Sequence, residues 1–302
     1  MTSAPAKSPL ATLAPAMFVV LWATGFVVAK LSAGHVAPVW FLALRFPAAM
    51  VFMLALALWQ RAYWPTPRLA FHAAITGVFM HGLYLAPLYW VVAHGMPAGV
   101  IALITGLQPL ITAFMAVPLL GEKVASRHWL GLMIGLCGVA VVLLPKLSFA
   151  LLGGITPLTT ALAVFGTASI SLGTVYQKKF ASGIALSTGG VWQYVGASLT
   201  VLLISLVIGD YGFDGTLQAW GALGWAVIVL SIFTVLLMVW LINRGAVSRL
   251  SSLMFLVPGV SALMTYLLFD ERLSLIQLLG MAVCAAAVLV VNRASTTPST
   301  AQ

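Results

Sequence analysis

The feature that most constrains this chain is a succession of strongly apolar stretches without charges. A helix needs roughly 20 consecutive apolar residues to cross the hydrocarbon core of a bilayer. Of the 302 residues, 62% are hydrophobic and only 6% are charged. A soluble domain carries about a quarter charged residues, so this chain cannot cover itself with a hydrated surface. The sequence therefore predicts an all-α integral membrane protein whose surroundings are the lipid bilayer.

Charged residues and Gly/Pro turns divide the chain into ten predicted transmembrane helices. They cover residues 12–31, 38–59, 69–92, 97–120, 127–144, 156–177, 186–208, 218–242, 247–269 and 274–292. The first apolar run, Leu10 to Ala29, follows Lys7 but is too long for a signal peptide, so we interpret it as a helix. The loops are short and leave no room for a soluble domain.

Basic residues are unevenly shared between the two sides of this predicted bundle. The N-terminus and every second connection together hold ten basic residues, whereas the opposite side holds three basic residues and four of the five acidic ones. Cytoplasmic loops carry an excess of Lys and Arg. We therefore predict that both termini face the cytoplasm, in a bacterial inner membrane. The net charge of +9 then reflects topology and not nucleic-acid binding.

Two segments of the chain resemble each other at a fixed distance. GLQPLITAFMAVPLLGEK is followed 149 residues later by FLVPGVSALMTYLLFDER, so that Pro109 matches Pro258 and Glu122 matches Glu271. Each half holds five predicted helices, and an odd number turns the second copy upside down. Inverted repeats are typical of secondary transporters, whose substrate site lies near the midplane between the repeats.

The repeat also predicts the domain organisation. We expect a disordered tail at 1–9, a first five-helix repeat at 10–145, an external linker at 146–155, a second repeat at 156–293 and a disordered tail at 294–302. Both tails are small, polar and rich in Pro, Ser and Thr, which favours disorder.

The chain resembles the drug/metabolite transporter superfamily, in particular its EamA-type carriers. The resemblance rests on the paired PLITAFMAVPLLGEKV and PGVSALMTYLLFDERL segments, on Ala43–Phe46 and on Trp22 with Gly25. It implies helices 1–4 and 6–9 around a central cavity, with helices 5 and 10 outside. The HGLYLAPLYW segment resembles YddG-like exporters of aromatic and other neutral amino acids.

Polar and aromatic side chains recur on single faces of several predicted helices. The candidate substrate-binding residues are Trp22, His81, Tyr84, Gln108, Thr112, Ser169, Tyr176, Ser252 and Phe255. A pocket with aromatic walls and scattered hydroxyl and amide groups suits a neutral or zwitterionic small molecule. Each residue also has a simpler interpretation, because Ser and Thr often bond a backbone carbonyl and aromatic rings often pack the core.

Few titratable groups fall within the predicted helices. His81 could bind a carboxylate or carry a proton, or could be a neutral hydrogen-bonding residue. For Arg45, snorkelling to the lipid headgroups is favoured over capture of a substrate carboxylate. No Asp or Glu lies inside a predicted span, which argues against carboxylate-based proton antiport of polycationic drugs.

Three residues are candidate hinges. Pro109 and Pro258 each remove a backbone hydrogen bond at matched positions of the two halves, and Gly259 loosens the second position further. Bending of these helices would open one side of the protein and close the other.

The sequence thus predicts a secondary transporter that works by alternating access. The resemblance implies that it exports small amphiphilic metabolites, most favourably aromatic and other neutral amino acids. The alternative is an exporter of another metabolite or drug, such as a nucleoside or a cationic compound, coupled to proton exchange. No protease motif or metal-ligand spacing is present, so neither an enzyme nor a cofactor or metal is expected. Gly131, Gly135 and Gly138 form a small-residue face that allows internal packing or a homodimer.

Overall fold

The structure is a computed structural model, and it describes residues 9–32, 34–96, 101, 104–122, 124–143, 154–244, 253–269 and 274–293. All regular elements among these residues are helices, as expected for an all-α membrane protein. Residues 1–8 and 294–302 of the predicted tails, Ser252 and most of the predicted linker at 146–155 lie outside the described residues. Pro9, which the sequence pattern assigns to the tail, begins the first helix.

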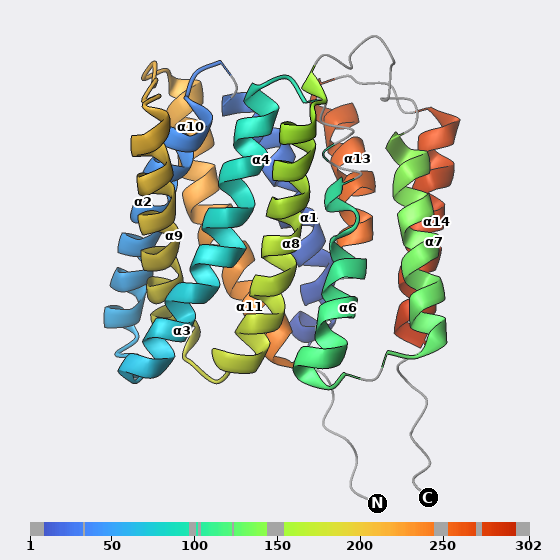
Figure 1. Ribbon diagram of the computed structural model, residues 1–302, viewed down its shortest axis with the longest axis horizontal. Coiled ribbons are helices and arrows are strands. Elements are labelled where there is room, and N and C mark those ends of the chain that lie inside the picture. Colours follow the sequence, from blue (N-terminus) through green and yellow to red (C-terminus); the bar gives the residue numbers. More distant parts are fainter. Residues whose placement is uncertain are drawn as a thin grey trace, which may run out of the picture.

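The first half of the chain contains helices that run nearly the full height of the bundle (Figure 1). The elements of this half are α1 (Pro9–Ser32), α2 (Pro38–Trp59), α3 (Pro67–Gly77), η1 (Val78–Gly82), α4 (Leu83–Ala93), α6 (Gln108–Leu120) and α7 (Ser126–Leu143), and α3, η1, α4 and α6 each cover only part of that height. α3, η1 and α4 follow one another without a break, and η1 is a π-helical turn within this long helix.

The second half repeats this order. Its elements are α8 (Pro157–Phe180), α9 (Leu186–Ile208), α10 (Leu217–Trp225), η4 (Ala226–Thr234), α11 (Val235–Arg244), η5 (Leu253–Leu256), α13 (Val257–Phe269) and α14 (Leu275–Arg293). Among the described residues, five continuous helices are long and apolar enough to cross a membrane. They cover 38–59, 67–93, 157–180, 186–208 and 217–244, and shorter apolar helices accompany them.

Local sequence sets where these helices begin and end. Thr66 and Thr156 precede α3 and α8, and each side-chain oxygen accepts a hydrogen bond from a backbone N–H of the first turn. A proline follows each cap at the first helical position, where its missing N–H is not needed. Gly121 and Gly209 end α6 and α9 with φ of 68° and 73°, a left-handed conformation that glycine adopts without strain.

The connections are sorted between two ends of the bundle. The α2–α3 and α8–α9 connections lie at the same end as the start of α1 and the end of α14 (Figure 1). Arg61, Arg68, Lys178 and Lys179 belong to this end, which we call the basic end. The α1–α2 and α9–α10 connections lie at the other end. They contain Asp210 and Asp214, and we call it the acidic end.

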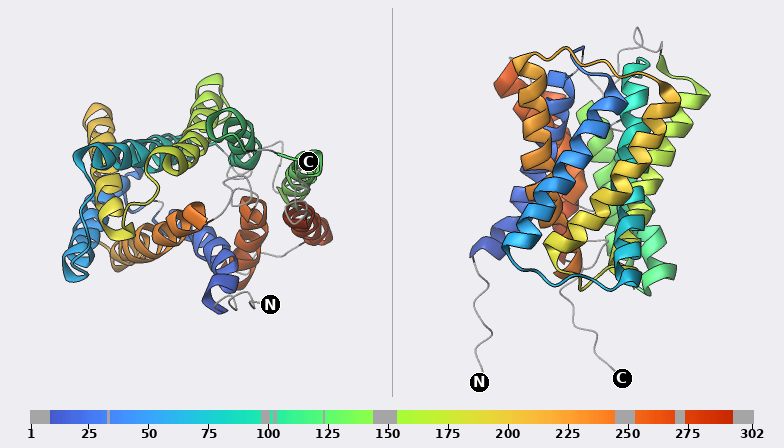
Figure 2. Two further views of the ribbon diagram at one scale, coloured as in Figure 1. Left: turned by 90° about the horizontal axis from the view of Figure 1, so that it is seen from below. Right: turned by 90° about the vertical axis from the view of Figure 1, so that its left-hand side faces the viewer.

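Seen along the bundle, most helices form a ring, and α7 and α14 stand outside it as a pair (Figure 2). The small-residue face of α7 packs inside the molecule: a Cβ on Gly135 would lie 2.4 Å from the Phe255 ring, and one on Gly138 would lie 2.8 Å from Cys284. Cys284 is a buried free cysteine and packs in this contact. Small residues here permit the close approach of α7 to α14.

The helix interruptions repeat between the halves. α6 and α13 each span 13 residues and begin and end at positions 149 apart. η1 falls, at the shift of 150 that relates Trp90 to Trp240, inside η4. The two halves therefore share their irregular backbone as well as their sequence pattern.

Close contact between α3 and α9 depends on two glycines. A Cβ on Gly77 would lie 1.7 Å from the Gln193 carbonyl oxygen, and one on Gly196 would lie 2.0 Å from the Ala74 carbonyl oxygen.

We expect Gly77→Ala to lower the free energy of unfolding by about 3 kcal/mol, because rigid backbones must separate. Gly221→Ala, in α10 with nothing within 4 Å of its Cβ, is the matched control. Equal thermal melting of the two purified variants would contradict this packing.

Candidate substrate cavity

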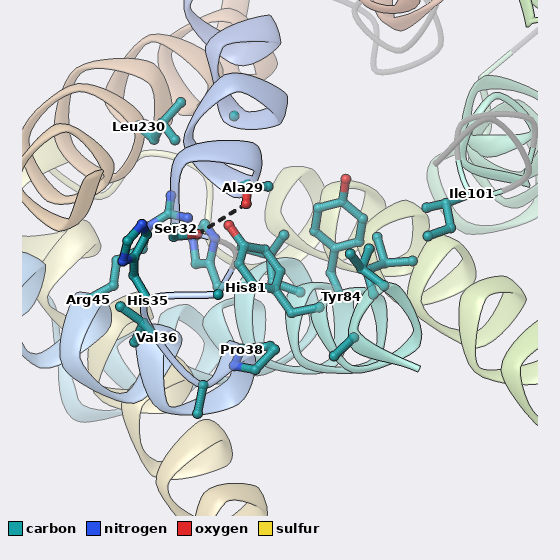
Figure 3. Close-up of a pocket in the computed structure, with 18 of the residues that line it drawn as sticks. Ala29, Ser32, His35, Val36, Pro38, Arg45, His81, Tyr84, Ile101 and Leu230 are labelled. Atoms are coloured by element: carbon teal, nitrogen blue, oxygen red, sulfur yellow. Dashed lines mark hydrogen bonds between the residues drawn. The ribbon is translucent and has the colours of Figure 1, made fainter. Parts of the chain in front are cut away.

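A cavity of about 820 Å³ lies inside the ring of helices. It reaches from Trp22, Met80 and Val235, near the middle of their helices, to the α1–α2 and α9–α10 connections at the acidic end. Figure 3 shows side chains from several helices directed into it, with Arg45 and His35 on one side and Tyr84 and Ile101 on the other. A space of this size accommodates a small organic molecule.

Three of the predicted substrate-binding residues line this cavity together: Trp22, His81 and Tyr84. Trp22 comes from α1, where its ring lies 5.3 Å from that of Phe18. His81 comes from η1 and Tyr84 from α4, so both belong to one continuous helix. Leu88, which the sequence assigns to the same face as His81 and Tyr84, lines the cavity as well.

Gln108 and Thr112 lie deeper in the protein and do not line the cavity. Gln108 is buried at the start of α6, where its backbone carbonyl accepts a hydrogen bond from Ser171 at 3.3 Å. Thr112 is completely buried, and its hydroxyl has no hydrogen-bond partner among the described residues. Thr105 lies three residues before Gln108, at a spacing that places the two on one helix face, and it does line the cavity.

Ser169, Tyr176 and Phe255 also lie away from the cavity. The Ser169 hydroxyl donates to the Phe165 carbonyl within α8, at 2.8 Å. The Tyr176 hydroxyl is hydrogen-bonded to Nδ1 of His72 at 2.7 Å, towards the basic end. Phe255 is fully buried against Gly135.

The three candidate hinge residues stand at helix starts. Pro109 and Pro258 are each the second residue of their helix, α6 and α13, and at Pro109 the missing N–H breaks no intrahelical bond. A turn precedes α6, and the 3₁₀ segment η5 precedes α13. Gly259 lets α13 approach α14, because a Cβ there would lie 2.9 Å from the Met281 side chain.

A buried polar network borders the cavity near His81. The His81 ring stacks on Tyr194, with ring centroids 5.2 Å apart. Its Nε2 lies 3.4 Å from Gln193 Oε1, Gln193 Nε2 donates to Gln177 Oε1 at 2.9 Å, and Gln177 Nε2 donates to the Ala181 carbonyl at 3.0 Å. Because a carbonyl can only accept, the chain fixes both amides, and His81 Nε2 must be the donor. Nδ1 is then the acceptor of a neutral His81.

Arg45 is buried, with 6% of its surface exposed, and lines the cavity. Its Nε donates to Ser231 Oγ at 2.8 Å, on the neighbouring η4 of the second half. Snorkelling to the lipid headgroups is therefore the wrong interpretation of this residue, because its guanidinium group lies inside the protein.

Several cavity residues were missed by the sequence analysis. Tyr89, Leu85 and Val92 extend the His81 face by the same helical spacing, so a longer window would have found them. Thr234 and Leu230 lie on η4, and a π-helix shifts side chains off the regular period. No feature of the sequence marks that shift.

The mouth of the cavity at the acidic end is crossed by contacts between the two halves. His35 Nδ1 and Asp214 Oδ2 are 2.5 Å apart, the Asp214 N–H donates to the His35 carbonyl at 3.0 Å, and the Ala37 N–H donates to Gly212 at 2.7 Å. The backbone N–H of Thr216 and the His35 ring stabilise the ionised carboxylate, which lowers the pKa of Asp214 below its ordinary value.

The basic end is held by different contacts. Lys178 Nζ donates to the carbonyls of Ile242 and Asn243 at 3.0 and 3.3 Å, which ties α8 to the last turn of α11. A cation at helix C-terminal carbonyls is favourable because it satisfies groups that lack intrahelical partners. Together with the His72–Tyr176 bond, these contacts join three helices below the cavity.

Comparison with known proteins identifies the class. The EamA-like transporter family matches residues 10–144 and again residues 158–293, so the chain belongs to this family of transporters. Two matched segments cover most of the chain, one in each half.

Individual relatives are similar over nearly the whole length. The uncharacterized inner membrane transporter YedA of Escherichia coli is 24% identical over 90% of this chain and 87% of its own. A probable amino-acid metabolite efflux pump of Escherichia coli is 25% identical over 87% of this chain and 88% of its own. A crystal structure with 19% identity covers 94% of this chain and 98% of its own at a TM-score of 0.78, which shows the shared fold.

The contact across the mouth predicts a pH effect on the two loops. The pKa of Asp214 is lowered, so the ionised carboxylate stabilises the contact between the two connections at pH values above the ordinary Asp range. This stabilisation is lost as the pH falls through the lowered pKa. We expect Asp214→Asn at neutral pH to accelerate hydrogen–deuterium exchange severalfold in residues 34–37 and 210–216. Asp210→Asn is the control, because the bond that the structure shows for Asp210 is to Gly212, in its own loop. Equal exchange in both variants would show that the contact does not hold the mouth.

Proposed function

We propose that this protein is an inner-membrane secondary transporter that exports small amphiphilic metabolites, most favourably aromatic and other neutral amino acids. The observation that carries the proposal is the 820 Å³ cavity between the two repeats, which extends to one end of the bundle. Its walls combine aromatic rings such as Trp22, Tyr84 and Tyr89 with few polar groups, a lining suited to an amphiphilic ligand. The similarity to an amino-acid metabolite efflux pump supports this substrate class.

In the proposed topology the chain crosses the membrane ten times, as two five-helix repeats of opposite orientation. The basic end faces the cytoplasm under the positive-inside rule, and with it both termini. The cavity then opens towards the outside, and the Lys178 and His72–Tyr176 contacts close the cytoplasmic side.

Transport would proceed by alternating access. The matched interruptions before α6 and α13 provide points at which two helices of opposite orientation can bend, with Pro109 and Pro258 starting the rigid segments. Bending would break the contacts at the basic end and form new ones around the mouth.

Facilitated diffusion down a substrate gradient needs no titrating group. Proton exchange would require one, and His81 is the candidate within the cavity.

Flux through proteoliposomes tests this function. The purified protein is reconstituted and assayed with labelled L-phenylalanine, L-alanine, uridine and a cationic dye, with and without an imposed proton gradient. We expect amino-acid flux that ignores the gradient. Dye or uridine flux driven by protons, without amino-acid flux, would overturn the amino-acid assignment in favour of a proton-coupled exporter.

Filling the cavity should stop that flux without unfolding the protein. Gly25 lines the cavity, and a Cβ there meets only Leu230 Cδ1, at an ordinary 3.9 Å. We expect Gly25→Leu to reduce L-phenylalanine flux about tenfold or more, equivalent to about 1.4 kcal/mol. Removing an aromatic wall in Trp22→Ala should also reduce it. Gly224→Leu, outside the cavity with open space around its Cβ, is the control, and an equal loss there would argue against this route.

A further inference from the structure

The charge on Arg45 has no acidic partner in the part of the chain that the structure describes. Arg45 is seven residues beyond the start of α2, which places it about 10 Å into the bundle at 1.5 Å per residue. Of the acidic residues described, Asp214 pairs with His35, Asp210 bonds the Gly212 N–H, and Glu122 lies at the basic end. Arg45 is therefore a buried cation without a described counter-ion.

The neighbours of the guanidinium group are neutral. Its Nε donates to the Ser231 hydroxyl, it lies 5.6 Å from the centre of the Phe46 ring, and Tyr89 lines the same cavity. These groups orient the cation and solvate part of it. They do not neutralise it, and a charge held inside a membrane protein is costly unless it serves a ligand or a partner.

The position of the guanidinium is fixed by further contacts. Ser231 accepts the Arg45 bond through its hydroxyl, and its backbone carbonyl accepts a hydrogen bond from the Tyr194 hydroxyl. Tyr194 is itself held in a cluster of three rings, in which Tyr194, His81 and Phe46 each contact the other two. A cation held in this way beside an open cavity is preorganised for an anion, because little side-chain entropy remains to be lost on binding.

We propose that Arg45 is the subsite for an anionic group of the substrate, specifically a carboxylate, with Ser231 as its positioning residue. The proposal rests on the proposed transport function and narrows it: the cavity selects molecules that carry one carboxylate on an apolar or aromatic body. A planar guanidinium matches a carboxylate through paired N–H donors. The aromatic side of the cavity, where Tyr84 lies across from Arg45, then receives the apolar part (Figure 3).

The test compares three probes that share a phenyl group and differ in which charged groups they carry. L-Phenylalanine has a carboxylate and an amine, 3-phenylpropionate keeps only the carboxylate, and L-phenylalaninamide keeps only the amine. Calorimetric binding to the purified full-length protein should favour the two carboxylates. In Arg45→Gln we expect their affinity to fall about 10- to 100-fold, the range for a lost hydrogen bond to a charged group. The affinity for the amide should not fall.

Further variants separate binding from folding. Arg45→Lys keeps the charge and should retain a preference for carboxylates. Ser231→Ala keeps the guanidinium but removes its acceptor, and should weaken carboxylate binding about threefold, because the cation is then less well positioned for the ligand. Arg68→Gln is the matched control, because Arg68 is exposed at the basic end.

The outcomes distinguish the subsite from the transporter. The subsite is wrong if the wild-type protein binds the amide as tightly as the acid, or if Arg45→Gln loses all three probes equally while its melting is unchanged. In either case the flux assay still tests the transport function separately. If no carboxylate binds but uridine or dye is transported, the subsite is wrong and the transporter stands. If nothing is bound or transported, both proposals fall.

Discussion

Backbone hydrogen bonding in a medium without water is the constraint on which the rest of this structure depends. In hydrocarbon every N–H and C=O must be bonded within the protein, so the chain is helical throughout its described apolar stretches. Irregular backbone is tolerated only where protein or a cavity surrounds it. The π-helical segments η1 and η4 obey this rule, because His81 and Thr234 on them line the cavity. The departures from regular helix thus mark the functional interior.

The repeat supplies a symmetric framework, and the side chains make it asymmetric. His81 on η1 and Ser231 on η4 occupy equivalent positions at the shift of 150, and both meet Tyr194. One position carries an imidazole that bonds Gln193, whereas the other carries the hydroxyl that holds Arg45. Because the backbones of the two halves match, each half can adopt the conformation of the other. Because their side chains differ, the cavity can recognise a ligand with two unlike ends.

Much of this fold follows from sequence, because turn chemistry fixes helix ends. The predicted spans 38–59 and 186–208 coincide with α2 and α9, where Pro38 begins one helix and Gly209 ends the other. The cavity face of η1 and α4 could also be predicted, since His81, Tyr84 and Leu88 recur at helical spacing. These features depend on local rules that a single sequence expresses.

The orientation of α8 could not be predicted in the same way. Phe165 and Ser169 are four residues apart beside the small, polar run GTASISLGT, and this spacing predicts that both face the cavity, yet Phe165 is exposed. The reason is packing: a Cβ on Gly166 would lie 2.9 Å from the Tyr84 carbonyl, and one on Gly173 would lie 2.5 Å from Met80. The small residues of α8 thus decide which face meets its neighbours, and the Ser169 hydroxyl bonds its own helix. In a bundle where apolar side chains gain little by leaving lipid, close approach of backbones outweighs polarity in setting helix rotation.

The two ends of the bundle differ in how they are held, and this difference bears on transport. At the basic end, Lys178 and the His72–Tyr176 bond join α8 to α11 and α3. At the acidic end, the His35–Asp214 contact joins only two connections and leaves the cavity beside them. An alternating mechanism requires the closed end to open at a cost of only a few kcal/mol, which a substrate can repay by binding the two states differently. At the basic end an apolar cluster that includes Phe18, Val175 and Ile242 packs the same helices together. Substrate binding must therefore offset the separation of this cluster as well as the loss of the hydrogen bonds.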